Sequence, residues 1–339
     1  MKLVEYKEQE VREFAKHLDF VGFAKRLGSA CYFDLNGHFQ GMSFAVTTLL
    51  HGNEPSGLFA IYQLLKTDFA PRHKVRFVIA SLTAALTEPL FTHRMLPGKK
   101  DLNRCFNPSA QGHKQTDLQI ALADAINDKI SQFKPDAIVD IHNTSGSGPA
   151  FGVAVEQSAE SLSLVSFFCQ RIIITDIHLG AIMEQDFGCP IVTIEAGGSQ
   201  DNDANDTAFM GLKNILLAKS PLKHQSILEV LLHPRRLEVK DAASITYSLE
   251  NNTDFDISMR SDIERHNFGI TPAGTHLGWV NKPIEQLLKL DNKDQVDAFF
   301  SLDGNKLIAK RALRLFMVTT RADIAVSDCL FYVVSADEN

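Results

Sequence analysis

The chain alternates short apolar runs, rich in β-branched residues, with longer helix-like segments as far as about residue 220, and this alternation constrains its fold most. The strand-like runs are Met42–Leu50, Lys74–Ser81, Ala137–Ile141, Phe151–Val155, Arg171–Thr175 and Pro190–Ile194. The main helical patterns between and after them are Leu58–Lys66, Thr116–Phe133 and Asp206–Ala218. Continuous apolar strands separated by helices are typical of a sheet that is buried on both faces. The sequence therefore predicts an α/β fold with a mixed, mostly parallel sheet and helices on both faces.

The pattern changes near Ser220–His224, and from about Ile227 onward short strands and turns replace most of the helical segments. A chain of 339 residues is long enough for about two domains. We therefore expect a larger domain over residues 1–222 and a smaller, β-rich domain over residues 223–339.

Charge and cysteine content exclude several classes of partner. Lys and Arg number 34 against 41 Asp and Glu, a net charge of −7, whereas nucleic-acid and anionic-membrane binding usually need a basic face. The charged N-terminus does not resemble a signal peptide, and no apolar run approaches the roughly 20 residues of a membrane span. The 5 cysteines are widely spaced and contain no C-x-x-C motif, which favours reduced thiols. We expect a cytoplasmic protein that binds neither nucleic acid nor membrane; its oligomeric state stays open.

Polar residues follow three of the predicted strands at the point where each strand ends. His51 and Glu54 follow the first, His142 follows Ala137–Ile141, and Glu195 follows Pro190–Ile194. Because parallel strands present their carboxyl ends at one edge, where ligands bind in open α/β sheets, these side chains should meet there. Two histidines and a carboxylate are typical zinc ligands, and a further free glutamate suits metal-assisted amide hydrolysis. Taken singly, a histidine at a strand end is more often a structural hydrogen-bonding residue. The shared position of these residues makes a metal site an equally good interpretation.

The segment DLNR at residues 101–104 lies in a loop between a predicted strand and a predicted helix. Asn103 and Arg104 could hold a substrate carboxylate through charge-assisted hydrogen bonds. From local sequence alone, an ordinary turn that carries a surface arginine is the favoured interpretation of these residues.

Four short motifs, taken together, resemble the succinylglutamate desuccinylase/aspartoacylase family of the zinc carboxypeptidase superfamily. They are HGNEPSG at 51–57, DLNR at 101–104, DIHNTS at 140–145 and TIEAGG at 193–198. The resemblance covers about half of the chain and implies a zinc-carboxypeptidase-like hydrolase domain in residues 1–222. Within residues 223–339, only FGITPAGTHLG at 268–278 resembles the family's second domain.

The resemblance also implies a role for individual residues. His51, Glu54 and His142 would bind one zinc ion per chain, and Glu195 would act as general base and then as general acid. Asn103 and Arg104 would bind the substrate carboxylate, and Asn143 would line the pocket.

Members of the family usually carry a further arginine just before DLNR, where it polarises the scissile carbonyl group. The nearest candidate is Arg94, although the segment MLPGKK separates it from Asp101. Lys99 or Lys100 could take its place.

We therefore expect a zinc-dependent hydrolase that cleaves the amide bond of a small N-acyl amino acid. Metal-activated water would attack the carbonyl carbon, with Glu195 as general base. One alternative is a metallocarboxypeptidase acting on short peptides. Another is a metal-dependent carboxylate-binding protein without catalytic activity. The acyl group, the amino acid and the presence of a second metal ion stay open.

Overall fold

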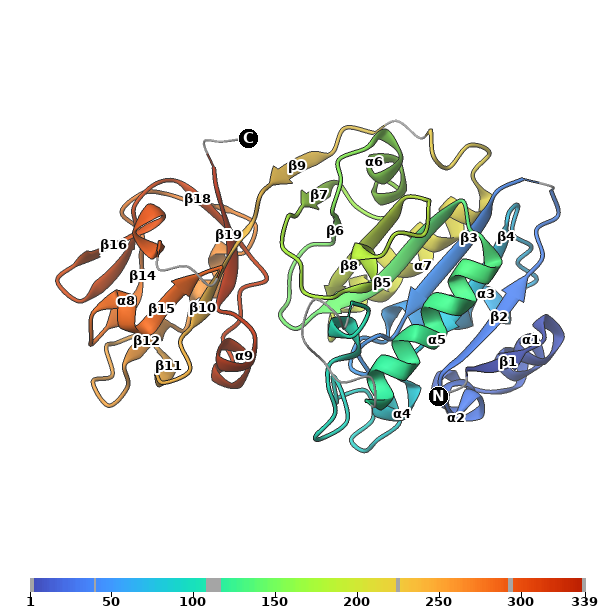
Figure 1. Ribbon diagram of the computed structural model, residues 1–339, viewed down its shortest axis with the longest axis horizontal. Coiled ribbons are helices and arrows are strands. Elements are labelled where there is room, and N and C mark those ends of the chain that lie inside the picture. The colour runs from blue at the N-terminus through green and yellow to red at the C-terminus, as the bar shows by residue number, and fades with distance from the viewer. Residues whose placement is uncertain (1–2, 40, 108–116, 224–225, 292–294, 337–339) are drawn as a thin grey trace. The chain divides into compact units, whose positions relative to one another are not determined.

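The computed structural model describes residues 3–39, 41–107, 117–223, 226–291 and 295–336 (Figure 1). The chain divides into two compact units, Met1–Glu229 and Val230–Asn339. This division falls a few residues beyond the boundary expected after residue 222. The two units are described separately below.

A nine-stranded sheet has the order β1-β2-β4-β3-β5-β8-β6-β7-β9. Strands β1 to β8 lie in the first unit, and the division after Glu229 falls within β9. The pairs β3–β4, β3–β5 and β5–β8 are parallel, whereas β2–β4 and β6–β8 are antiparallel. The expected mixed, mostly parallel sheet is therefore confirmed. The strands are β1 (Val4–Tyr6), β2 (Cys31–Leu35), β3 (Ser43–Thr48), β4 (Lys74–Ile79), β5 (Ala137–Thr144), β6 (Phe151–Ala154), β7 (Arg171–Ile174), β8 (Ile191–Gly198) and β9 (Glu229–Leu232).

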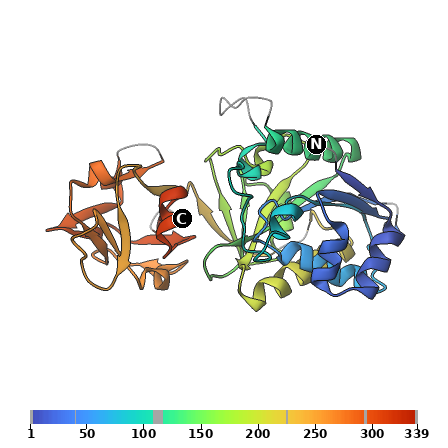
Figure 2. The same ribbon diagram turned by 90° about the horizontal axis from the view of Figure 1, so that it is seen from below.

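Helices cover both faces of this sheet, as expected. The long helix α5 lies on one face, and α3 and α7 pack side by side on the other (Figure 2). Buried residues of α5, among them Ile120 and Ile126, share a core cluster with Val78 and Ile138 of the sheet. The helices are α1 (Glu8–His17), α2 (Phe20–Leu27), α3 (Ser56–Lys66), α4 (Leu82–Ala85), α5 (Leu118–Phe133), α6 (Ala159–Val165) and α7 (Asn202–Leu217).

Two helix starts differ from the sequence-based expectation. Thr116, where α5 was expected to begin, lies outside the described residues. Asp117 caps α5, because its carboxylate accepts a hydrogen bond from Gln119 N at 2.8 Å. Helix α7 begins at Asn202, four residues before the expected start at Asp206.

The register of the three central strands brings their carboxyl ends together. Thr48 of β3 pairs with Ile141 of β5, which pairs with Ile194 of β8. One residue further along, His142 pairs with Glu195. Every residue of β5 is buried. Burial of both faces fixes the register of this strand and therefore the position of the polar groups at its end.

The second unit is β-rich, as expected, and contains two five-stranded sheets. Their orders are β13-β18-β19-β10-β15 and β11-β12-β14-β17-β16. Aliphatic side chains from both sheets, such as Leu237 and Leu307, form one core cluster. The elements are β10 (Arg235–Val239), β11 (Ile245–Ser248), β12 (Ile257–Arg260), β13 (Ile270–Thr271), β14 (His276–Val280), α8 (Ile284–Leu287), β15 (Leu288–Leu290), β16 (Phe300–Asp303), β17 (Lys306–Ala309), β18 (Leu313–Phe316), α9 (Ala322–Ser327) and β19 (Phe331–Ser335).

None of the helices in the described parts of the chain has both the length and the apolar character needed to cross a membrane.

Candidate active site

A tight turn leads from β3 into α3 and carries His51 and Glu54. At Gly57, in the first turn of α3, an added Cβ atom would lie 2.1 Å from Thr48 Oγ1. Only glycine therefore lets the start of α3 pack this closely against the end of β3. The close packing places the turn directly above the strand end.

His51, Glu54 and His142 form a compact buried group. Glu54 Oε1 lies 2.7 Å from His51 Nδ1, and Glu54 Oε2 lies 2.7 Å from His142 Nδ1. One ligand atom from each residue can be chosen such that all three lie within 4.8 Å of one another. Two imidazole nitrogens and a carboxylate oxygen form the donor set of a catalytic zinc site, which leaves one coordination position open. The group therefore fits the metal that the sequence predicts.

Each imidazole also contacts a second carboxylate, through the ring nitrogen that Glu54 does not contact. Asp101 Oδ1 lies 2.9 Å from His51 Nε2, and Asp140 Oδ2 lies 2.7 Å from His142 Nε2. Thr47 Oγ1 donates to the other oxygen of Asp140 at 2.6 Å. A carboxylate that binds one ring nitrogen fixes the tautomer and directs the other nitrogen toward the metal. Both Nδ1 atoms accordingly face Glu54.

The spacing of Asp140 and His142 offers Asp140 as a partner of the histidine, whereas no spacing offers Asp101 as a partner of His51. Asp140 precedes His142 by two residues on the same strand face, and that spacing is visible in the sequence. The contact between Asp101 and His51 joins segments 50 residues apart. No local pattern reports it, although Asp101 is part of the DLNR motif.

The charges in this group stabilise one another. Burial alone would raise the pKa of Glu54, but His51 and His142 together hold it well below its usual range. Burial would lower the pKa of His142, but Asp140 and Glu54 raise it well above its usual value. The pKa of Asp101 is held low against burial by His51 and Arg94. The carboxylates of Glu54 and Asp101 and the imidazole of His142 therefore favour their charged forms.

Glu195 differs from the other buried carboxylates. Its Oε2 atom is buried and has no hydrogen-bond partner among the described residues. Burial raises the pKa of Glu195 to about 7; Glu54 also raises it, whereas the nearby His142 lowers it. The sequence left the direction of this shift open. A carboxyl group with this pKa can exchange a proton near neutral pH.

Arg94 lies at the site in spite of the six residues that separate it from Asp101. Its Nε and Nη2 atoms donate to Asp101 Oδ2 at 3.1 and 2.9 Å, and Nη1 lies 3.4 Å from Glu54 Oε1. Lys100 instead pairs with Asp117 at 3.6 Å, and Lys99 is exposed. Of the three candidate cations, Arg94 is therefore the one in contact with the ligand group.

The DLNR segment forms a short 3₁₀ turn, Leu102–Arg104, capped by Asp101. Asn103 is buried, and its Oδ1 atom accepts a hydrogen bond from Ile182 N at 3.0 Å. Arg104 Nη1 donates to the carbonyl oxygen of Asn103 at 3.0 Å. Within the described ranges Arg104 makes no ion pair with a carboxylate, although its charge helps to hold the pKa of Asp101 low.

Asn143 is buried between β5, β8 and the start of α3. Its Nδ2 atom donates to Ser56 Oγ at 2.9 Å and to Gly197 O at 3.1 Å, and its Oδ1 atom accepts from Ser56 N at 3.1 Å. Both amide hydrogens are therefore used within the protein. A contact between Asn143 and substrate stays a prediction.

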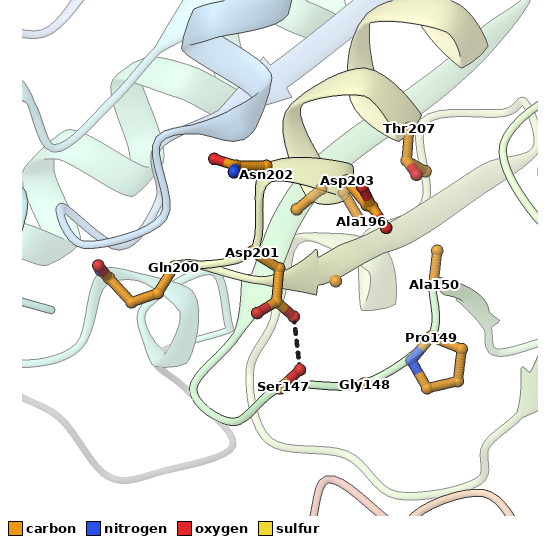
Figure 3. A pocket seen from close by; sticks show the side chains of 12 residues that line it. Ser147, Gly148, Pro149, Ala150, Ala196, Gln200, Asp201, Asn202, Asp203 and Thr207 are labelled. Atoms are coloured by element: carbon orange, nitrogen blue, oxygen red, sulfur yellow. Dashed lines mark hydrogen bonds between the residues drawn. The ribbon is translucent and has the colours of Figure 1, made fainter.

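A cavity of about 620 Å³ lies between the loop at Ser147–Ala150, the end of β8 and the start of α7 (Figure 3). Ala196 and Gly197, the two residues that follow Glu195 in β8, both line it. Asp201, at its rim, accepts hydrogen bonds from Ser147 Oγ at 2.9 Å and Gly198 N at 3.2 Å.

Comparison with known proteins identifies a family whose catalytic domain this chain matches. Residues 40–211 match the family model of the succinylglutamate desuccinylase/aspartoacylase catalytic domain, and a search of curated proteins found no match. The four motifs described above lie inside the matched range.

Solved structures share the fold at low sequence identity. A succinylglutamate desuccinylase from Vibrio parahaemolyticus is 14% identical, with a TM-score of 0.60 and coverage of 94% of each chain. A succinylglutamate desuccinylase/aspartoacylase from Rhodobacter sphaeroides is 17% identical, with a TM-score of 0.55, and the match covers 86% of this chain and 84% of that one. Murine aminoacylase 3 is 13% identical, with a TM-score of 0.53, and the match covers 86% of this chain and 94% of that one.

The family model spans half of the chain and includes every residue of the buried His-Glu-His group and Glu195. The family consists of hydrolases with a carboxypeptidase-like fold that depend on zinc and act on small N-acyl amino acids. On this match, the chain belongs to the succinylglutamate desuccinylase/aspartoacylase family.

Proposed function

We propose that this protein is a zinc-dependent amidohydrolase that cleaves the amide bond of a small N-acyl amino acid. The observation that carries the proposal is the position of Glu195. The buried Oε2 atom of its carboxylate has no hydrogen-bond partner in the described chain, and its β-strand position pairs with that of His142. A protein that only bound a metal and a carboxylate would have no need for such a group.

His51, Glu54 and His142 would hold one zinc ion per chain. A bound zinc ion would supply a Lewis acid that stabilises developing negative charge and lowers the pKa of water to about 7. Glu195 would take a proton from the attacking water and deliver the proton to the leaving nitrogen of the amide. Its raised pKa, about 7, suits both transfers.

Arg94 would stabilise the oxyanion that forms at the carbonyl oxygen. Its guanidinium is held by Asp101 and extends to Glu54, and it is about one-third exposed. A cation that is fixed in place before the reaction does not have to reorganise when the charge develops.

Asn103 and Arg104 would bind the carboxylate of the substrate. Arg104 carries a charge without an ion-pair partner among the described residues, and the Oδ1 atom of Asn103 is occupied by Ile182 N. The donor groups that remain suit an anion. Proteins of similar fold carry names such as succinylglutamate desuccinylase, whose named substrate has carboxylates on both the acyl group and the amino acid.

A hydrolysis screen tests the proposal. Zinc-loaded protein would be incubated with N-acetyl, N-succinyl and N-formyl amino acids and with dipeptides, and release of free amine would be measured. We expect turnover of at least one class of N-acyl amino acid. Turnover of dipeptides alone would point to a carboxypeptidase, and no turnover at all would contradict the proposal.

A further inference from the structure

The turn at residues 179–184 is built around one carboxylate. Glu184 Oε1 accepts hydrogen bonds from Leu179 N at 2.7 Å and Ala181 N at 3.0 Å, and Oε2 accepts from Gly180 N at 3.0 Å. The Glu184 side chain is only 4% exposed. Three backbone N–H groups thus donate to one buried carboxylate. This fixes the conformation of the turn, because a different conformation would cost the N–H groups their hydrogen-bond partner.

This turn packs against the DLNR segment through two hydrogen bonds that run in opposite directions. Ile182 N donates to Asn103 Oδ1 at 3.0 Å, and Phe106 N donates to Gly180 O at 3.0 Å. The two segments are 79 residues apart in sequence. The turn therefore determines the position of the Asn103 side chain from outside its own loop.

Asn103 is held at both its backbone and its amide. Its backbone N–H donates to Asp101 Oδ1 at 2.8 Å, and its side-chain oxygen accepts from Ile182 N. Because the oxygen is directed toward Ile182 N, the Nδ2 hydrogens are the donors that the amide group can offer to a ligand. The orientation of this donor depends on Ile182 N, and the position of Ile182 N depends on the turn that Glu184 organises.

We propose that Glu184 is a positioning residue for substrate binding, which acts by orienting the amide of Asn103. Glu184 itself touches no reacting atom. The inference deepens the proposed function and rests on it, because it takes Asn103 as a ligand of the substrate carboxylate. Glu184→Gln replaces one acceptor oxygen by an NH₂ group and leaves at least one backbone N–H of the turn without a partner.

Hydrogen exchange measured by mass spectrometry tests the positioning without any assay of activity. In Glu184→Gln, exchange should become faster in peptides that cover 179–184 and also in those that cover 101–106. Asp186→Asn is the matched control, because Asp186 lies in the same loop but, among the described residues, accepts a hydrogen bond only from Gly188 N, at 2.8 Å. Unchanged exchange over 101–106 in Glu184→Gln, or an equal change in Asp186→Asn, would overturn the inference.

Steady-state kinetics with an N-acyl amino acid from the screen, for example N-succinylglutamate, tests the consequence for binding. Glu184→Gln should raise KM by about tenfold, the effect of weakening one hydrogen bond to a charged group. Its kcat per bound zinc should stay close to that of the wild type. A loss of kcat with unchanged KM would show a merely structural role and contradict the inference.

A double-mutant cycle shows whether Glu184 acts through Asn103. If it does, adding Glu184→Gln to Asn103→Ala should not raise KM further, because coupled residues are not additive. Full additivity would overturn the inference. A wild type that hydrolyses no substrate in the screen would contradict the proposed function, and the exchange experiment would still decide whether Glu184 positions Asn103.

Discussion

Asp101 Oδ1 lies 2.9 Å from His51 Nε2, so a residue from the DLNR segment orients a histidine in the turn that follows β3. The other oxygen of the same carboxylate accepts two hydrogen bonds from the guanidinium of Arg94. One side chain thus couples the candidate metal group to the candidate oxyanion-stabilising cation. This coupling explains how Arg94 reaches the site although an extended loop separates it from Asp101.

Replacing Asp101 by asparagine should weaken zinc binding. The change removes the negative charge that orients His51, and loss of such an outer partner typically lowers metal affinity about 10- to 100-fold. Competition with a chromophoric chelator measures the effect. Asp34→Asn is the matched control, because Asp34 also binds an arginine, Arg76, through two hydrogen bonds but pairs with no histidine in the described part of the chain. Equal zinc affinity in Asp101→Asn and the wild type would show that Asp101 does not contribute to metal binding.

Replacing His142 by alanine should remove most of the metal. One of three protein ligands is lost, and a catalytic zinc site needs all three to hold its ion. The fold should survive, because β5 keeps its backbone pairing with β3 and β8. Elemental analysis should find about one zinc per chain in the wild type and far less in the variant. Equal zinc in the wild type and in a His51→Ala/His142→Ala double variant would show that the metal site is elsewhere.

Activity should fall on the acid side of its pH profile. Glu195 must be ionised to take a proton, and burial raises its pKa to about 7. Below that pH the carboxyl group is protonated and cannot act as base; above it the group is ionised and active. A bound cation lowers the pKa of a nearby acid, so the limb in kcat/KM should lie at or below about pH 7. A profile that stays flat down to pH 4 would contradict this role.

Arg104→Lys should weaken the binding of substrates that carry a free carboxylate. Lysine keeps the charge but lacks the planar fork that binds both carboxylate oxygens. We expect kcat/KM to fall by an amount equivalent to about 1.5–3 kcal/mol, the value of a hydrogen bond to a charged group. Substrates with an amidated carboxylate serve as the comparison and should change little. An equal loss for both kinds of substrate would assign Arg104 a structural role.

The parts of the fold that could be predicted from sequence are those with a strong local pattern. β3, β5 and β8 are short runs dominated by β-branched or other apolar residues, and their ends could be located well enough to place His51, His142 and Glu195 at one edge. The start of α7 was expected too late because its first turn is rich in exposed Asn and Asp. Those residues look like a loop, although a helix start favours them.

The features that could not be predicted from the sequence are contacts between segments that lie far apart along the chain. The antiparallel pairs β2–β4 and β6–β8 have no signature in one strand alone. The contact between Asp101 and His51 and that between Ile182 and Asn103 each depend on how distant loops pack. The same holds for Asn143, whose amide hydrogens are taken up by Ser56 and Gly197. Residue types identified the chemistry at these positions, and only the packed structure shows which side chains meet.

The role of Glu195 is the centre of this account, and amine release by zinc-loaded Glu195→Gln tests it most directly. Glutamine is nearly isosteric, and the orphaned Oε2 atom has no hydrogen bond to lose within the described chain, so fold and zinc content should match the wild type. Turnover of an N-acyl amino acid should fall by roughly 10²–10⁴, the contribution of a positioned acid–base group, while ligand affinity measured by calorimetry changes far less. Turnover close to that of the wild type, at equal zinc content, would contradict the account.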